Sequence, residues 1–513
     1  MSDYDVNSIK SLSQIDSIRL KPSMYIGTTS QDGINQLVYE IWDNSLDEYS
    51  AGYGNEIDVF IDKDNYITIK DHGRGVPADL HPEWKNLDGT PMYTLTGIFT
   101  KIHAGGKLFA DGTSGYFSTV GVFGVGSTAV NCLSDYFEVT SCRDNKIYNQ
   151  KFSKGEPISN VEIMVGSDQT GTTIKFHPDP TIFKSTIQPN DKKLRNRLDE
   201  ITSLNVNLKV NYKNELAKTE EEFYYPNGIS DYIKNKLLKE KPLLFDNPIY
   251  YKDKFIKDNE FVDVEFSFIY TDEVESNEII KTFANNVSTK EHGTHLQGFK
   301  EGFKEAINQY AINKKWISEP IEIKYLMDNI CLIVSVKLRE CELDGQTKNK
   351  LGNILAKEGV AEIVKKYFEK LDKEQQNIIQ TIIERANKVK EAEEAARRAR
   401  INTRKANQIK KMALPGKLAD CGNTKGYTEL FMCEGLSAAG SAKDARYREF
   451  QAVLPLRGKI LNVEKTGFEK MINSEVIKSL IASIGTGIGK HFDISKCRYD
   501  KVILMTDADR IFY

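Results

Sequence analysis

The chain has 513 residues, of which 40% are hydrophobic and 28% are charged, and its formal net charge is −3. No apolar run approaches the ~20 residues of a membrane-spanning helix, and the first residues show no secretory signal, so we expect no membrane partner and a cytoplasmic location. The length predicts about three or four domains, and the seven scattered cysteines, which lack zinc-ligand spacing, are expected to be reduced.

The first predicted unit combines helix and strand. Residues 33–51 have apolar side chains at helical spacing, and two short β-rich runs follow between residues 56 and 70. A second helix is expected to open at Gly124, after a glycine-rich run, and residues 170–176 read as a later strand. This order predicts an α+β domain that ends before Glu220.

A second α+β unit is expected from Phe223 to about Lys390. Its strand candidates, 262–270 and 330–338, stand on either side of a helix predicted for residues 294–312. Between Ile354 and Met412 the chain has no proline and a single glycine, so this stretch predicts a long helix.

The end of this long helix is basic. Residues 397–411 contain seven lysines and arginines and no acidic residue, and Pro415–Gly416 ends the helix. Such a stretch is either a solvated linker or a face that contacts nucleic-acid phosphates.

Three polar residues of the first helix share one face. Glu40, Asn44 and Asp47 stand at positions i, i+4 and i+7, so their side chains leave the helix on the same side. Apolar neighbours partly desolvate Glu40, which suits a general base for water. The neutral amide of Asn44 can ligate Mg²⁺ beside a triphosphate without adding negative charge. Taken alone, this spacing is more often a solvated helix face.

Two glycine-rich turns favour a nucleotide site instead. Asp71-His72-Gly73-Arg74-Gly75 directly follows a strand, and its aspartate is a natural acceptor for the amino group of adenine. Residues 121–126 lead into a helix, whose N-terminal amides favour phosphate. Thr172 places a hydroxyl at a strand start, where it could hold a water shared with Asp71. A P-loop is excluded because Gly-Lys-Ser/Thr is missing, and a Rossmann fingerprint because the run does not follow the first strand.

In this order the parts resemble the GHKL ATPase fold, and RLKPSMYIG, HAGGK and QTKNKL are similar to signatures of gyrase and topoisomerase IV B subunits. The resemblance covers Tyr4 to Asp509. It implies ATP and Mg²⁺ as cofactors, with Glu40 as catalytic base, Asn44 as magnesium ligand and Asp71 as adenine reader. The other nucleotide-binding residues that it implies are Tyr4, Asp47, Gly73, Arg74, Gly75, Val76, Pro77, Lys107, Tyr116, Gly121, Val122, Gly124, Val125, Gly126, Thr172, Gln346 and Lys348.

Gln346-Thr347-Lys348 lies far downstream, in the second unit. The resemblance implies that Lys348 reaches the γ-phosphate of ATP and acts in catalysis as a sensor. A cation on one domain that meets a γ-phosphate on another stabilises a closed state until hydrolysis, which can drive rigid-body switching. Tyr4 matches an N-terminal arm that embraces the partner protomer in this family, so homodimerisation through the ATPase domain is expected.

The final unit alternates strands and helices, which is the α/β pattern. Glu434 ends one apolar strand run, and Asp507 and Asp509 end another, so the carboxylates come at carboxyl ends of strands, where Mg²⁺ can be held. With PLRGKILNVEK between them, these residues resemble the Toprim module of type II topoisomerases. That resemblance implies a metal site of Glu434, Asp507 and Asp509 and DNA contacts by Arg457, Lys459 and Asn462.

Two departures from the family pattern follow. The family usually reads EGDSAGGSA, but here Leu436 replaces the acid, which puts the metal geometry or the DNA contact in doubt. After Asp509 the family continues, whereas Arg510–Tyr513 closes this chain, so we expect a partial Toprim fold with an exposed apolar sheet edge. We therefore expect a split, interrupted or truncated gene, plausibly from a phage, and a separate polypeptide that completes the Toprim domain.

The sequence thus predicts an α+β multidomain protein. Its parts are a GHKL (Bergerat) ATPase domain with a dimerisation arm at 1–219, a ribosomal-S5-like transducer domain with a long helix at 220–395, and the helix end with a partial α/β Toprim domain at 396–513. We expect the ATP-hydrolysing B subunit of a type II topoisomerase. It would gate double-stranded DNA and supply Mg²⁺-binding residues for cleavage by an A-type subunit that carries the catalytic tyrosine. The alternative is a cleavage-incompetent, ATP-switched DNA clamp or decoy subunit; a MutL-like repair protein is disfavoured by the Toprim-like residues.

Overall fold

The chain divides into two compact units, Met1–Ala386 and Asn387–Tyr513, and each is described by itself. The computed structural model describes residues 12–86, 88–104, 124–166, 168–273, 278–344, 349–410, 415–423, 426–457, 461–462, 465–466, 468–489 and 492–506. None of the helices in these ranges is both long and apolar enough to span a membrane. All seven cysteines are free.

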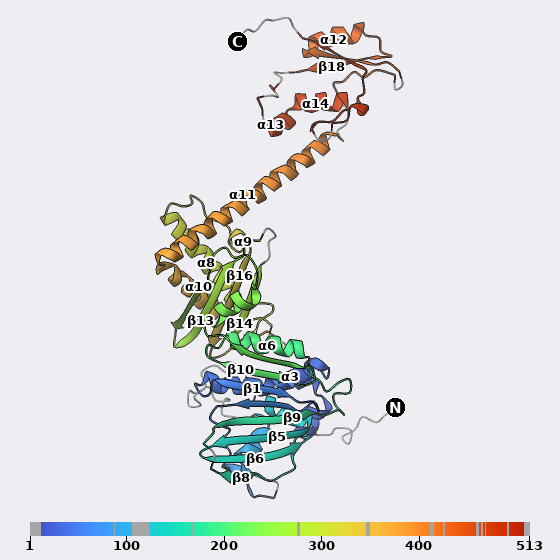
Figure 1. Cartoon of the computed structure of the whole chain (residues 1–513). Coiled ribbons are helices and arrows are strands. Elements are labelled where there is room, and N and C mark those ends of the chain that lie inside the picture. The colour runs from blue at the N-terminus through green and yellow to red at the C-terminus, as the bar shows by residue number, and fades with distance from the viewer. Residues whose placement is uncertain are drawn as a thin grey trace, which may run out of the picture. The chain divides into compact units, whose positions relative to one another are not determined.

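A sheet of nine described strands forms the base of the first unit, in the order β11-β10-β1-β2-β9-β5-β6-β7, with β8 paired to β6 (Figure 1). The pairing of β1 with β10 is parallel, and the other pairings are antiparallel. The strands are β1 Glu56–Ile61, β2 Ile67–Asp71, β5 Ser134–Arg143, β6 Lys146–Ser153, β7 Glu156–Pro157, β8 Glu162–Val165, β9 Gly171–Pro178, β10 Lys209–Asn214 and β11 Thr219–Tyr224.

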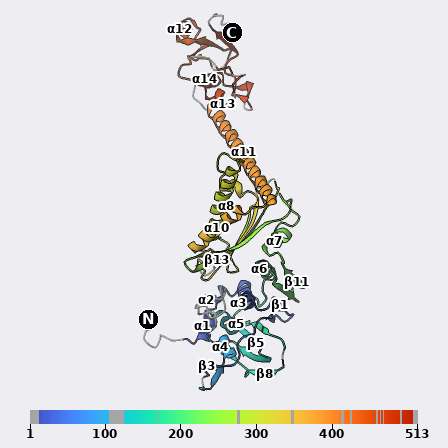
Figure 2. The ribbon, with the colours of Figure 1, turned by 90° about the vertical axis from the view of Figure 1, so that its left-hand side faces the viewer.

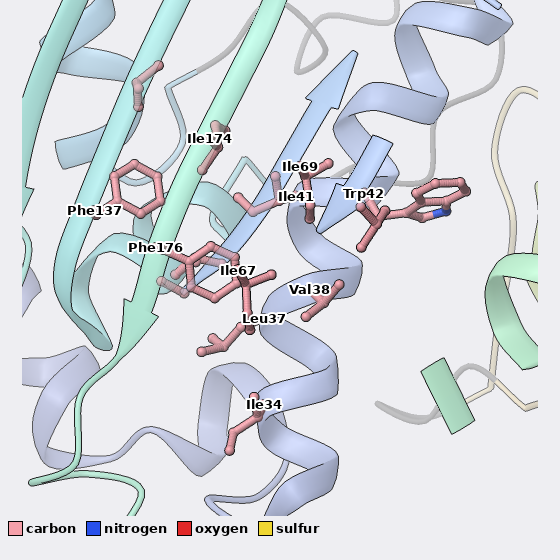
Figure 3. Close-up of a cluster of buried hydrophobic side chains, with 14 of the residues drawn as sticks. Ile34, Leu37, Val38, Ile41, Trp42, Ile67, Ile69, Phe137, Ile174 and Phe176 are labelled. Carbon is pink, nitrogen blue, oxygen red and sulfur yellow. The ribbon is translucent and has the colours of Figure 1, made fainter. Parts of the chain in front are cut away.

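One helix, α3, organises the face of this sheet. It spans Gln31–Ser50, and its apolar side chains pack on β2 and β9; Figure 3 shows Leu37 and Ile41 of α3 beside Ile67 and Phe176 of these strands. The helix predicted for residues 33–51 is therefore confirmed. The remaining elements of this part are α1 Gln14–Leu20, α2 Ser23–Ile26, α4 Thr94–Thr100, α5 Gly126–Cys132, α6 Asp191–Ser203 and a small sheet of β3 Leu80–Lys85 and β4 Pro91–Tyr93.

The predicted start of the second helix is wrong by two residues. Helix α5 opens at Gly126 rather than Gly124, because Gly124 has a φ of 59° and so lies outside the right-handed helical region.

A second sheet of the first unit has the strand order β12-β13-β16-β14-β15. Helices α8 and α10 cover one face of it and lie side by side (Figure 2), with the backbone of α10 close to Gly298 and Gly302 of α8. Its strands are β12 Ile249–Lys257, β13 Glu260–Tyr270, β14 Ile279–Ala284, β15 Val287–Ser288 and β16 Ile330–Leu338. The helices are α7 Ile229–Tyr232, the π-helix η2 Ile233–Leu237, α8 Thr294–Asn313, α9 Ile323–Leu326 and α10 Ile354–Glu369.

The single long helix expected from residue 354 onward is wrong. The structure has two helices, α10 and α11 (Lys373–Lys410), with a break at residues 370–372. Asp372 caps α11: its Oδ1 accepts from the Gln375 amide at 2.8 Å, and the Gln375 Oε1 accepts from the Asp372 amide at 3.1 Å. This reciprocal capping box provides a helix start, which the absence of proline and glycine did not reveal.

The second unit contains a parallel sheet in the order β18-β17-β19. Its strands are β17 Glu429–Glu434, β18 Gln451–Leu456 and β19 Lys501–Met505, and its helices are α12 Gly435–Ala445, α13 Phe468–Asn473, α14 Glu475–Ile484 and the 3₁₀-helix η4 Ile494–Lys496. Parallel strands connected by helices confirm the predicted α/β character of this part.

Candidate functional site

The half-buried carboxylate of Glu40 lies in the middle of α3. Its Oε1 accepts a hydrogen bond from Gln36 Nε2 at 2.7 Å. One turn further on, Asn44 Nδ2 donates to the Glu40 carbonyl at 3.0 Å and to Ser127 Oγ of α5 at 2.9 Å. The amide of Asn44 is thus fixed between the two helices by its nitrogen, and its oxygen is the kind of ligand that Mg²⁺ takes.

The first turn of α5 lies against Glu40. A Cβ at Gly126 would stand 2.0 Å from Glu40 Oε2, so only glycine allows this approach. The turn is held in place by the segment after α4: Thr128 Oγ1 donates to the Lys101 carbonyl at 3.1 Å, and the His103 amide donates to the Gly124 carbonyl at 2.9 Å. The first amides of a helix have no intrahelical partners, so this end of α5 favours an anionic group.

Asp71, the last residue of β2, is buried and accepts three hydrogen bonds from its neighbours. Its Oδ1 accepts from the amides of Gly73 at 2.9 Å and Thr172 at 3.1 Å, and its Oδ2 accepts from Ser45 Oγ at 3.2 Å. Burial raises the pKa of Asp71, while these hydrogen bonds act in the opposite direction. Thr172 therefore contacts Asp71 through its backbone amide. The role expected from the sequence is a different one, in which its hydroxyl holds a water shared with Asp71.

A cavity of about 420 Å³ adjoins the turn after Asp71. Arg74 lies on its wall, donates from Nε and Nη2 to both carboxylate oxygens of Glu48 at 3.0 and 2.9 Å, and stacks 4.1 Å from the ring centroid of Tyr53. Arg143 of β5, also on the wall, donates to the Gly75 carbonyl at 3.1 Å. Sequence reasoning missed Arg143, since no local pattern connects it with a turn 68 residues earlier.

The predicted site residues differ in how they are placed. Asp47 is only 1% exposed and lies deeper than Glu40 and Asn44. Val76 is half-buried, and its carbonyl accepts from Ser141 Oγ at 2.8 Å, whereas Pro77 is exposed. The residues that lie outside the described part are Tyr4, Lys107, Tyr116, Gly121, Val122, Gln346, Lys348, Lys459, Asp507 and Asp509.

In the second unit, Glu434 and Arg457 lie at the carboxyl ends of two neighbouring parallel strands. Glu434 ends β17, is exposed, and pairs in register with Leu456, the residue before the exposed Arg457. Asn462 is exposed, and its Oδ1 accepts from the Lys465 amide at 3.2 Å. Among the described residues no three histidine, cysteine, aspartate or glutamate side chains could together hold a metal ion; Asp507 and Asp509 are not among them.

Three family models match the chain. The model of histidine kinase-, DNA gyrase B-, and HSP90-like ATPases matches residues 29–182, that of DNA gyrase B matches 228–402, and that of the Toprim domain matches 429–511. The chain is 40% identical to the DNA gyrase B protein of Thermotoga maritima, over 99% of this chain and 79% of that protein. It is also 40% identical to the DNA gyrase B protein of Streptococcus pyogenes, over 99% and 77%.

The chain belongs to the DNA gyrase B family. The 43K ATPase domain of Thermus thermophilus gyrase B, solved with an aminocoumarin, superimposes with a TM-score of 0.64 at 31% identity, covering 75% of this chain and 97% of that one. The ATP-binding domain of Francisella tularensis topoisomerase IV gives a TM-score of 0.56 at 30% identity, covering 73% and 97%.

Family membership confirms the main predictions from the sequence. The chain is an ATPase B subunit of a type II topoisomerase, with a GHKL ATPase domain, a gyrase B transducer domain and a Toprim domain. The relatives named above are bacterial, so the expected phage origin finds no support in them.

Proposed function

We propose that Glu40 is the general base that activates water for attack on the γ-phosphate of ATP, and that Asn44 ligates the Mg²⁺ ion of the nucleotide. The proposal rests on how close Glu40 lies to the first turn of α5: a Cβ at Gly126 would stand 2.0 Å from Glu40 Oε2. The carboxylate therefore lies at the start of a helix, which favours phosphate. Bound Mg²⁺ would neutralise charge on the phosphates. Gln36 holds the carboxylate and Ser127 holds the amide of Asn44.

Asp71 and the glycine turns complete the nucleotide site in this proposal. Asp71 accepts the adenine amino group, with Thr172 and Gly73 fixing its orientation. Gly121, Val122, Gly124, Val125 and Gly126, together with Lys107 and Tyr116, contact the phosphates. The cavity beside Arg74 gives space next to the adenine end of this site.

The wider role is ATP-gated passage of double-stranded DNA in the cytoplasm. Two copies dimerise on ATP binding through their ATPase domains, with Tyr4 in the exchanged arm and Lys348 on the γ-phosphate. An A-type subunit supplies the nucleophilic tyrosine, while Glu434, Asp507 and Asp509 hold Mg²⁺ for cleavage. Arg457, Lys459 and Asn462 contact DNA phosphates, and the fully exposed Arg397–Arg400 stretch of α11 adds positive charge for the same duplex.

Among the described strands, β19 lies at the edge of the parallel sheet, and its exposure supports one further partner. Val502, Leu504 and Met505 are 40%, 70% and 42% exposed on an edge strand. We propose that a polypeptide segment completing the Toprim sheet pairs with this edge, because an exposed apolar edge strand favours pairing with another strand. Slower hydrogen exchange at residues 501–505 when that segment is bound is the expected result, at the amides that the pairing with β17 does not already protect; equal exchange with and without it would exclude the pairing.

The proposal for Glu40 is tested by comparing Glu40→Ala with Asp32→Ala, an exposed acid of the same helix that pairs with Lys193. We expect Glu40→Ala to lose at least 100-fold in ATP turnover while still binding a nonhydrolysable ATP analogue, since a general base contributes roughly 10²–10⁴-fold. Asp32→Ala should turn over ATP as the unaltered chain does. Undiminished hydrolysis by Glu40→Ala would remove Glu40 from the role of base.

Leu436 favours a second function, a DNA clamp that closes with ATP but does not support cleavage. Leu436 is 55% exposed at the start of α12, two residues after Glu434, where the family usually has an acid. With an A-type subunit, ATP and Mg²⁺, the topoisomerase function predicts covalent protein–DNA adducts. The clamp predicts closure on DNA without adducts, and Leu436→Asp would then restore them.

A further inference from the structure

The junction of the ATPase domain with the transducer includes residues 204–208, which follow α6; α6 is labelled in Figure 1. On one side, Tyr49 of α3 donates a hydrogen bond from its hydroxyl to the Val206 carbonyl at 2.6 Å. Helix α3 also carries Glu40 and Asn44, so the loop is tied directly to the helix that bears the site.

On the other side, the same loop is bonded to two strands of the transducer. Lys337 Nζ of β16 donates to Asn205 Oδ1 at 3.3 Å, and Asn205 Nδ2 donates to Asn286 Oδ1 at 3.4 Å. Asn286 belongs to the turn between β14 and β15, and Asn285 of this turn clamps the end of β16 by two hydrogen bonds with Leu338, of 2.8 and 2.9 Å.

The junction also has ion pairs and apolar contacts. Lys281 of β14 pairs with Glu200 of α6, and Lys236 of η2 pairs with Asp199 of α6 at 2.9 Å. Leu204 is 3% exposed and packs in one cluster with Phe283 of β14 and Ile333 of β16. Apolar contacts are not directional, so they allow one domain to turn on the other, whereas the hydrogen bonds and ion pairs, those of Asn205 among them, favour one orientation. Asn205 is 2% exposed, and the removal of its partner would leave a buried polar group unpaired.

Strand β16 leads directly into the segment that carries the proposed sensor. Lys337 stands one residue before the end of β16, and the segment 339–351 follows, with Lys348 within it. The end of this segment is fixed to the start of α8, since the Glu291 amide donates to the Asn349 carbonyl at 2.9 Å and the Leu351 amide to the His292 carbonyl at 3.0 Å.

We propose that Lys337 and Asn205 are positioning residues for ATP turnover, because their contact sets the orientation of β16, which precedes the proposed sensor Lys348 in the chain, relative to the helix that carries Glu40. This inference rests on the proposed function. Among the described residues, the side-chain hydrogen bonds of Lys337 and Asn205 run to each other, to Asn286 and to the Ile201 carbonyl, and none runs to Glu40, Asn44 or Asp71. Their effect passes through Val206 and Tyr49 on one side and through the end of β16 on the other.

The experiment uses the full chain and compares Lys337→Met with Lys337→Arg and with Lys257→Met as a matched control. Lys257 lies on β12, is 48% exposed and pairs with Glu358 of α10 at 2.6 Å. We expect Lys337→Met to lower kcat for ATP about tenfold, as expected for one lost hydrogen bond to a charged group. KM and Tm should stay near the values of the unaltered chain, and Lys337→Arg should recover most of kcat.

Two further results decide the inference. Asn205→Ala should reproduce the loss, and the double variant should lose no more than either single variant, since both changes break the same contact. A kcat within twofold of the unaltered chain, additive losses, or an equal loss in Lys257→Met would overturn the inference. Amide hydrogen exchange gives a test that does not depend on ATP turnover. Residues 204–208 and 339–344 should exchange faster in Lys337→Met than in the unaltered chain, and unchanged exchange there overturns the inference. An unaltered chain that binds no ATP would instead overturn the proposed function.

Discussion

Replacing Gly126 by alanine should slow ATP hydrolysis while the fold stays intact. The added Cβ would lie 2.0 Å from Glu40 Oε2, while ordinary contacts begin at 3.4 Å, so the carboxylate must move by about 1.4 Å. Because the contacting atom is the end of a flexible side chain, the fold can absorb the change by rotating Glu40. A misplacement of ~1 Å in a reacting group costs on the order of 100-fold in rate, or about 2.7 kcal/mol in the activation free energy.

Steady-state ATPase kinetics and binding of a nonhydrolysable ATP analogue measure this prediction. Gly126→Ala should lower kcat about 100-fold while the melting temperature and the affinity for the analogue change little. Gly440→Ala in α12 is the matched control, since a Cβ there would meet no atom within 4 Å. A kcat within threefold of the unaltered chain would refute the reasoning, and so would a loss of analogue binding as large as the loss of kcat.

Three more predictions follow from single contacts. Asp71→Asn keeps an acceptor for the Gly73 amide and removes a buried charge whose pKa burial raises, so we expect ATP affinity to fall by at least 100-fold in titration calorimetry while the melting temperature is kept or rises. Burial lowers the pKa of His295 to about 3, so between pH 6.5 and 3 the unfolded chain binds a proton that the folded chain does not. The free energy of unfolding should therefore be ~2 kcal/mol lower at pH 5 than at pH 7. Over the same pH interval, the melting temperature of His295→Gln should drop less than that of the unaltered chain. Asp372→Ala removes the cap of α11 at a cost of ~1 kcal/mol, which should speed hydrogen exchange of the Gln375 amide about fivefold.

Local sequence patterns predicted the helix and strands of the candidate site but not how deeply each side chain is buried. The helical spacing of Glu40, Asn44 and Asp47 placed them on one face of α3, where the structure has them. It could not show that Asp47 would be buried, because burial depends on strands far away in the sequence that cover the second half of the helix. The break before α11 had a local signal, Asp372 followed by Gln375, which the prediction of one long helix overlooked.

The contacts that join domains had no such signal. Asn205 and Lys337 are 132 residues apart, and neither belongs to a motif, so only the folded chain brings them together. Within the ATPase domain, Arg143 likewise belongs to no motif and lies 68 residues from Gly75, whose carbonyl it contacts. Hydrogen bonds between distant segments depend on how the sheets are registered and packed, and periodicity carries no information about this.

We expect residues 349–351, α8 and α10 to move as one body, because their backbones are in contact. A Cβ at Gly293 would stand 2.3 Å from the Leu351 carbonyl oxygen, and one at Gly298 would stand 2.2 Å from the Lys357 carbonyl oxygen, so backbones touch at both points. Interfaces packed this closely do not deform gradually. Residues 349–351 should therefore move together with α8 and α10. A connection of three residues, 370–372, joins α10 to α11, and Asp372 of this connection caps α11.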